Sequence, residues 1–277
     1  MAGARLTHAA WLERVPDLLA QRVEAWDLRP GEPYVVGAAG SVVRVQRADG
    51  TPAVLKLVYP HREAEHEADA LELWDGDGAV RLLARDDWAM VIERCEPGLP
   101  VATLGGEAAL DVLVALLPRL WKPAGAPFRA LAEEAAWWIE YVPAEWERLG
   151  QPFERRLADA ALEALRSLAT TQGEQVLVSQ DLHAQNVLSA EREPWLAIDP
   201  KPLVAEREFA IAPIVRSFEL GEGRRAMRRR FDRLTAELGL DRERARGWAL
   251  GQTIAWAFDS PYLASHAATA RWLLEAW

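Results

Sequence analysis

The segment LVSQDLHAQNVL at residues 177–188, followed by WLAIDPK at residues 195–201, decides the fold. Asp181 and Asn186 stand between apolar residues, and Asp199 closes an apolar run further along the chain. This pattern predicts a loop, a strand, a turn and a second strand that bring three oxygen-bearing side chains together. Phosphoryl transfer needs a carboxylate near the attacking hydroxyl and hard oxygen ligands for magnesium. We therefore expect Asp181 to orient or deprotonate a hydroxyl, and Asn186 and Asp199 to hold the metal.

A lysine upstream fits the same chemistry. The stretch TPAVLKLVYP at residues 51–60 places Lys56 within a β-type run, like the VAIK strand of protein kinases. A lysine inside such a run is costly unless it meets an acid or a phosphate. Glu67, in the helix expected at residues 61–74, is the predicted partner, and Glu63 one turn earlier is the alternative. We expect Lys56 to contact the α- and β-phosphates of a nucleotide.

A glycine-containing hairpin precedes the lysine strand. In VVGAAGSVVRV, Gly37, Gly40 and Ser41 fall between two β-type runs. Glycine allows backbone N–H groups to approach phosphates, although a hairpin of this kind, taken alone, is also compatible with a plain turn. No Walker A lysine–serine pair follows, which disfavours a P-loop nucleotide hydrolase. Its place ahead of Lys56 favours a nucleotide-binding loop.

The segment VIERCEPG at residues 91–98 follows a buried-type strand and predicts a connector between two lobes. We expect adenine to bind the backbone here, with the carbonyl of Glu93 and the N–H of Cys95 as the predicted contacts. The thiol of Cys95 is expected to be a small buried apolar group without chemistry of its own.

Composition limits the classes of function. The chain has 277 residues, a formal net charge of −10, and one cysteine, which excludes an internal disulfide. The acidic balance argues weakly against nucleic acid as the main partner and suits a cationic substrate, although solubility alone also explains it. Neither a signal peptide nor an apolar run of about eighteen residues is evident, so we expect a cytoplasmic protein that does not bind membranes. We also expect a monomer or a weak homodimer.

Hydrophobic periodicity predicts an α+β chain with two lobes. A helical pattern over residues 1–29 precedes several short β-type runs, the helix at 61–74 and two further strands expected at Val80 to Leu83 and Trp88 to Cys95. Residues 104–170, and the chain after about residue 206, have helical spacing. We therefore predict a small antiparallel-sheet lobe at 1–95 and a larger helical lobe at 96–277.

Several ordered motifs resemble one family of kinases. They are ADGTPAVLKLVYP, HEADALELWDGDGAVRLL, VIERCEPG and QDLHAQNVLSAEREPWLAIDPKPLVAERE. With these motifs the chain resembles the aminoglycoside phosphotransferases, in particular the branch of aminoglycoside/hydroxyurea antibiotic resistance kinases that includes streptomycin 6-phosphotransferases. The resemblance implies a protein-kinase-like two-lobe fold, ATP as donor, magnesium as cofactor and a hydroxyl on a small polar acceptor. It also implies that Asp181 is catalytic, that Asn186 and Asp199 bind metal, and that Lys56 with Glu67 positions phosphate.

Two positions depart from the family pattern. The family usually has histidine two residues before the catalytic aspartate, where this chain has Ser179, and often has Phe-Asp where this chain has Phe209-Ala210. Both departures affect the support of loops and not the groups that would touch phosphate, so an active kinase is expected. We interpret His183 as a hydrogen-bonded loop histidine. Lys201 could contact phosphate, but a surface salt bridge is the favoured interpretation.

The acceptor site is expected in the helical lobe beside Asp181. Carboxylates next to aromatic faces suit cationic groups. The candidates are Glu133, Glu134 and Glu140 near Trp137-Trp138, and Asp259 near Trp256. The sequence leaves three alternatives open: a kinase for an aminoglycoside such as streptomycin, a kinase for hydroxyurea or another hydroxylated metabolite, and a catalytically silent binding module.

Overall fold

The computed structural model describes residues 7–37, 40–258 and 261–275. The N-terminal part comprises α1 (His8–Ala25), β1 (Arg29–Gly37), β2 (Gly40–Gln46), β3 (Pro52–Val58), the 3-10 helix η1 (Arg62–Ala64), α2 (Glu67–Trp74), β4 (Leu82–Asp86) and β5 (Ala89–Glu93). The C-terminal part comprises η2 (Val101–Leu104), α3 (Gly106–Leu120), α4 (Leu131–Arg148), α5 (Arg155–Ala169), β6 (Gln175–Ser179), β7 (Val187–Ser189), β8 (Trp195–Ala197), β9 (Pro202–Glu206), η3 (Arg207–Ile211), α6 (Ala212–Arg216), α7 (Gly223–Glu237), α8 (Arg242–Ala255) and α9 (Leu263–Leu274).

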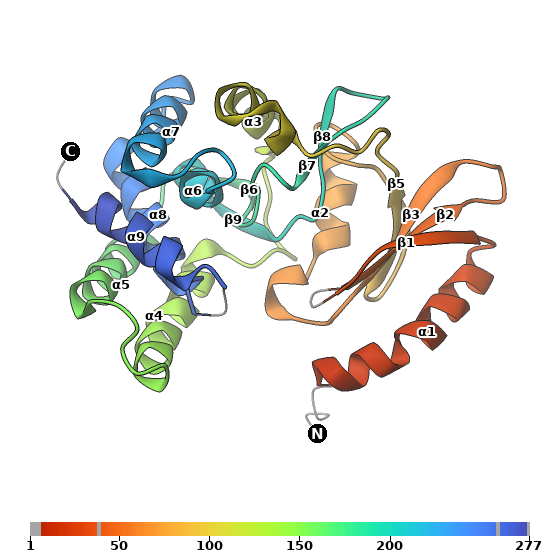
Figure 1. Cartoon of the computed structure of the whole chain (residues 1–277), viewed down its shortest axis with the longest axis horizontal. Coiled ribbons are helices and arrows are strands. Elements are labelled where there is room, and N and C mark those ends of the chain that lie inside the picture. Colours follow the sequence, from red (N-terminus) through yellow and green to blue (C-terminus); the bar gives the residue numbers. More distant parts are fainter. Residues whose placement is uncertain (1–6, 38–39, 259–260, 276–277) are drawn as a thin grey trace.

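The N-terminal strands form one antiparallel sheet in the order β1-β2-β3-β5-β4. Successive side chains of a strand point to opposite faces, so the side chains of β3 pack on both faces of the sheet. Leu55 packs with Trp11 of α1 in one apolar cluster, whereas Val54 and Val58 pack with Leu71 of α2 in another. Helices α1 and α2 thus cover opposite faces of the sheet (Figure 1).

The same alternation aims Lys56 at α2. Lys56 lies between Val54 and Val58 on the strand face that α2 covers, and Glu67 is the first residue of α2. The period of two therefore brings the lysine and the glutamate together across the sheet–helix interface.

Two local predictions for the N-terminal part were wrong in their limits. The helix expected at 61–74 is divided, because His66 adopts a left-handed conformation (φ 66°) between η1 and α2. The strand expected at Val80 to Leu83 begins only at Leu82, because Val80 instead donates its N–H to the carbonyl of Ala197 in β8. At Val80 a tertiary hydrogen bond therefore overrides the local strand pattern.

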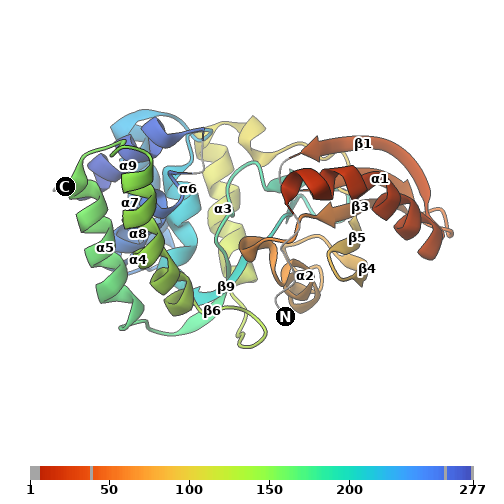
Figure 2. The same ribbon diagram turned by 90° about the horizontal axis from the view of Figure 1, so that it is seen from below.

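The C-terminal part is mainly helical and holds two small antiparallel sheets, β6 with β9 and β7 with β8. Helices α4, α5, α8 and α9 gather at one end of the molecule, and the five-stranded sheet with α1 forms the other end (Figure 2). The small sheets lie between these ends (Figure 1). The predicted α+β, two-lobe architecture is confirmed, and we propose the lobe boundary at 95/96, between β5 and η2.

Among the helices of the described residues, none combines the length and the apolar character needed to cross a bilayer.

Candidate active site

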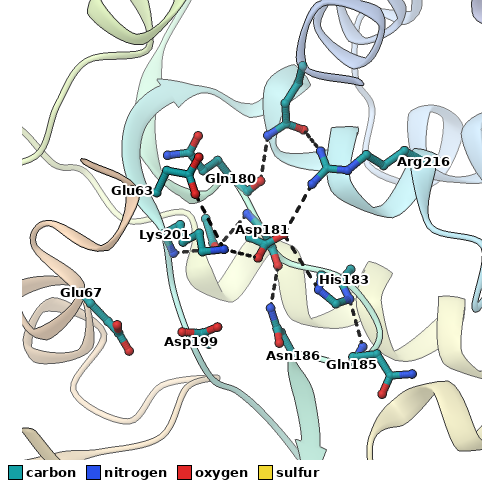
Figure 3. Close-up of polar contacts among 12 residues, drawn as sticks. Glu63, Glu67, Gln180, Asp181, His183, Gln185, Asn186, Asp199, Lys201 and Arg216 are labelled. Carbon is teal, nitrogen blue, oxygen red and sulfur yellow. Dashed lines mark hydrogen bonds and ion pairs between the residues drawn. The ribbon is translucent and has the colours of Figure 1, made fainter. Parts of the chain in front are cut away.

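Four chemical groups gather because four short strands end or begin beside one another. Asp181 follows β6, Asn186 precedes β7, Asp199 follows β8, and Lys201 precedes β9. The side-chain amide of Asn186 donates to the carbonyl of Asp181 at 3.0 Å, which ties the two ends of the loop together. Figure 3 shows these side chains converging on one space between the lobes. The three residues predicted for phosphoryl transfer are therefore neighbours.

Asp199 has an unusual backbone conformation. Its φ is 51°, in the left-handed region that L-residues seldom adopt and that aspartate tolerates better than most. Such a residue costs on the order of 1 kcal/mol and is typical of functional sites. Its side chain remains 40% exposed, so the carboxylate is held towards the space between the lobes.

Lys56 makes ion pairs with both Glu67 and Asp199. Burial alone would lower the pKa of the Lys56 ammonium, but the two carboxylates outweigh it and hold this pKa above its ordinary value. Lys56 is therefore charged at neutral pH. The structure pairs it with Glu67, and the alternative partner Glu63 instead lies 3.9 Å from Nζ of Lys201.

Two cations contact the carboxylate of Asp181. Nζ of Lys201 donates to Oδ2 at 2.7 Å, and a guanidinium nitrogen of Arg216 lies 3.4 Å from Oδ1. The expectation that Lys201 forms a surface salt bridge was wrong, because its side chain is only 16% exposed and its partner is Asp181 itself. The sequence did contain a signal for this contact. Lys201 follows Asp199 by two residues and directly precedes β9, so it lies in the same turn as the proposed metal ligand, beside the catalytic loop.

A second layer of hydrogen bonds supports the loop. The hydroxyl of Ser179 accepts from the backbone N–H groups of Asp181 and Lys201 at 3.3 and 3.2 Å. From α8, Gln252 donates to the carbonyl of Gln180 at 2.8 Å and accepts from Arg216 at 2.6 Å. These contacts brace the loop in a chain that has Ser179 and a buried Ala210 at the two atypical positions.

A cavity of about 470 Å³ opens beside Asp181 on the side of the helical lobe. Its lining includes the aromatic residues Trp137, Tyr141, Trp256 and Tyr262 together with polar and charged residues. Trp137 and Tyr141, one helical turn apart on α4, stack with centroids 4.6 Å apart. The cavity is therefore open to a molecule with apolar faces and has the proposed catalytic carboxylate at its edge.

Two carboxylates other than Asp181 line this cavity, Glu63 and Glu219. Burial raises the pKa of Glu63 above its ordinary range, although the Lys201 charge opposes the rise. For Glu219, burial would raise the pKa, but hydrogen bonds outweigh it, that from His183 first, and lower the pKa to about 2. His183 lies 2.9 Å from Glu219, in agreement with its interpretation as a hydrogen-bonded loop histidine.

The acids predicted for the acceptor site lie elsewhere. Glu134 is fully buried in ion pairs with Arg62 and Arg129, and Glu133 and Glu140 are exposed and absent from the lining of this cavity. Trp256 does line it, but its predicted partner Asp259 lies outside the described residues. Glu63 and Glu219 were not predicted for the acceptor site, because neither stands near the tryptophan pair in the chain.

The nucleotide-side candidates occupy the sheet and the connector. Gly37 pairs with Gly40 at the end of the β1–β2 hairpin. A Cβ on Gly40 would lie 2.7 Å from the carbonyl oxygen of Leu57, so close strand packing requires glycine there. Ser41 is fully buried. The Ser41 hydroxyl is therefore not accessible to a phosphate, which leaves the backbone of the hairpin as the candidate contact.

At the connector, the carboxylate of Glu93 pairs with Arg192 of the β7–β8 hairpin at 2.8 Å. Cys95 is buried, and burial raises the pKa of its thiol to about 12. The thiol is therefore protonated at neutral pH.

The donor set fits a magnesium ion that is shared with a nucleotide. Among the described residues, no group of three or more His, Cys, Asp or Glu side chains could hold a metal unaided. Mg²⁺ is commonly bound through one or two protein oxygens plus phosphates and water. The Asn186 amide nitrogen donates to the Asp181 carbonyl, which leaves the amide oxygen available to a metal, and the partly exposed carboxylate of Asp199 is a second available oxygen donor.

Comparison with known proteins decides the family. The model of the aminoglycoside/hydroxyurea antibiotic resistance kinase family matches residues 25–260. The chain belongs to this family. As a member it is a small-molecule kinase, a phosphotransferase that acts on hydroxyl groups.

Individual relatives agree with this assignment. The chain is 41% identical over 254 residues to a streptomycin 6-kinase of Streptomyces griseus, a match that covers 88% of this chain and 82% of that protein. It is 42% identical over 253 residues to a hydroxyurea phosphotransferase of Kitasatospora aureofaciens, covering 88% and 72%. A thermostable mutant of aminoglycoside phosphotransferase APH(4)-Ia, solved with ADP and hygromycin B, shares the fold with a TM-score of 0.62 at 12% identity over 94% of this chain and 96% of that one.

Proposed function

We propose that this kinase transfers the γ-phosphate of ATP to a hydroxyl group of a cationic aminoglycoside such as streptomycin. The observation that carries the proposal is the cavity beside Asp181, which combines the carboxylates of Glu63 and Glu219 with several aromatic faces. Aromatic faces and carboxylates together suit ammonium and guanidinium groups. The volume of about 470 Å³ falls within the usual range for small-molecule sites.

On the donor side, we propose that ATP binds between the lobes. Lys56, held by Glu67, would contact the α- and β-phosphates, the hairpin at Gly37 and Gly40 would approach phosphate through its backbone, and the backbone at Glu93 and Cys95 would bind adenine. Two features support this placement: Lys56 is buried and charged, and it contacts Asp199 from the opposite lobe.

Asn186 and Asp199 would hold Mg²⁺, which neutralises phosphate charge when bound. Asp181 stands on the acceptor side, where it would orient the attacking hydroxyl. In the transfer, the acceptor O–H bond breaks, its proton passes to Asp181 and a new O–P bond forms. The bond between the γ-phosphorus and the bridging oxygen breaks, and ADP leaves.

Hydroxyurea is the second candidate acceptor, supported by the 42% identity to a hydroxyurea phosphotransferase. Hydroxyurea is small and uncharged, so it would bring no cationic group to the two cavity carboxylates. The cavity therefore favours the aminoglycoside.

The test is phosphate transfer from Mg-ATP to streptomycin and to hydroxyurea in parallel, followed by release of ADP and by the mass of the product. Phosphorylated streptomycin, formed with a higher kcat/KM than any product from hydroxyurea, is the expected outcome. Efficient transfer to hydroxyurea without transfer to streptomycin would overturn the choice of acceptor. ATP binding without transfer to either would overturn both acceptors.

A further inference from the structure

Lys201 places an ammonium group between the nucleotide side and the acceptor side of the site. Its Nζ lies 2.7 Å from Asp181 Oδ2 and 3.9 Å from Glu63 Oε2, and 5.2 Å from the ring centroid of Trp256. It follows Asp199 by two residues, so the proposed metal ligand and the lysine leave the same turn. In Figure 3 the lysine lies between Glu63 and Asp181, with Asp199 nearby.

The two cations that contact Asp181 differ in freedom. Arg216 is 8% exposed, donates to Gln252 at 2.6 Å and lies over Trp256 at 4.4 Å, so its guanidinium is fixed from several sides. Lys201 has fewer close partners: among the described residues, Asp181 is the hydrogen-bond acceptor of its ammonium, and Glu63 lies further away at 3.9 Å. A lysine ammonium has three donors on a flexible stem, so two remain for another acceptor.

The transferred group needs such donors. During transfer, negative charge spreads over the three non-bridging oxygens of the phosphoryl group, and donors fixed in a water-poor site stabilise that charge. Lys56 is already engaged by Glu67 and Asp199 on the nucleotide side. Of the two cations beside Asp181, where the phosphoryl group must arrive, Lys201 is the less constrained.

We propose that Lys201 is a catalytic residue whose ammonium donates a hydrogen bond to a non-bridging oxygen of the transferred phosphoryl group. This inference rests on the proposed kinase mechanism and adds a residue to it. Lys201 keeps its proton throughout, while the acceptor proton passes to Asp181 as described above. The lysine therefore binds the phosphoryl group and Asp181 together, which aligns the hydroxyl with phosphorus.

A different role for Lys201 would be to fix the orientation of Asp181 alone. The two roles differ when no acceptor is present. A complex of ADP, magnesium and fluoride contains a planar anion in place of the transferred phosphoryl group, so its affinity reports contacts to that group without the hydroxyl. Lys201→Met removes the ammonium and keeps the length of the side chain, and Lys201→Arg retains the charge. Lys122→Met is the matched control, since Lys122 pairs with Asp77 away from the site.

The experiment measures the affinity of each variant for ADP with magnesium, with and without fluoride, and its thermal unfolding. We expect Lys201→Met to weaken binding of the fluoride complex by about 100-fold, with little change for ADP alone, and Lys201→Arg to recover most of the loss. Lys122→Met should match the wild type. If Lys201→Met binds the fluoride complex like the wild type, the proposal is overturned, whatever its effect on turnover. Because no acceptor is used, a wrong choice of acceptor does not affect this result. If Lys201→Met does not fold, Lys201→Gln replaces it in the same comparison.

Discussion

The hydroxyl of Ser179 accepts a hydrogen bond from the backbone N–H of Asp181 at 3.3 Å. The same oxygen accepts from the N–H of Lys201 at 3.2 Å, so one buried side chain joins the catalytic loop to the start of β9. The family usually has a histidine at this position, and the hydroxyl supplies part of the missing support. Substitution of Ser179 therefore tests directly how the loop that carries Asp181 is held.

Ser179→Ala should lower kcat by roughly 10-fold and leave the KM for ATP nearly unchanged, because the loop that carries Asp181 loses its tie to β9. The loss of buried hydrogen bonds should also lower the free energy of unfolding by about 1–2 kcal/mol. Steady-state kinetics and urea unfolding measure the two effects. Ser189→Ala is the control, since the Ser189 hydroxyl likewise accepts a backbone N–H, that of Leu99, outside the catalytic loop. Equal losses of kcat in both variants would show that the Ser179 hydroxyl has no special role.

Glu219→Gln should raise the KM for a cationic acceptor by about 10-fold, which corresponds to about 1.4 kcal/mol of lost attraction. The KM for ATP should change little, because Glu219 lines the acceptor cavity and not the nucleotide side. Glu140→Gln is the matched control, because Glu140 is an exposed acid of α4 outside this cavity. The assignment of the cavity to the acceptor fails if the two substitutions have the same effect on the acceptor KM.

His266 should make the protein less stable as the pH falls. Burial, and then the nearby charge of Arg216, lower the pKa of this histidine from 6.5 to about 4. Between these values the unfolded chain binds the proton and the folded chain does not, so the free energy of unfolding decreases on acidification. The contribution of this one group is about 3 kcal/mol between pH 6.5 and pH 4.

Urea unfolding across this range measures the slope. His266→Gln cannot bind the proton in either state, so its stability should depend less on pH than that of the wild type. The same substitution at His61, which is only partly buried, should retain the wild-type slope. A His266→Gln variant with an unchanged slope would assign the pH dependence to other groups.

The sequence was most informative where chemistry depends on order along the chain. Asp181, Asn186 and Asp199 could be placed together because each stands where a short strand ends or begins, and Lys56 could be directed at Glu67 because strand alternation fixes its face. These relationships follow from local periodicity and short connections.

The acceptor side depends on tertiary packing and was not predictable in the same way. Glu134 looked accessible beside the tryptophan pair, but its helix face is covered by Arg62 and Arg129. Glu219 enters the cavity only because the segment after α6 returns to the catalytic loop, where His183 holds it. No period or spacing in the chain signals such a contact.

Turnover of streptomycin by wild type and Asp181→Asn, with Mg-ATP affinity measured for both, tests the central claim most directly. Because Asp181 acts on the acceptor hydroxyl, the variant should lose about 10³-fold in kcat and bind Mg-ATP almost as the wild type does. Asp199→Asn should instead lose affinity for Mg-ATP. Near-normal turnover of Asp181→Asn would contradict the assignment of the phosphoryl-transfer centre.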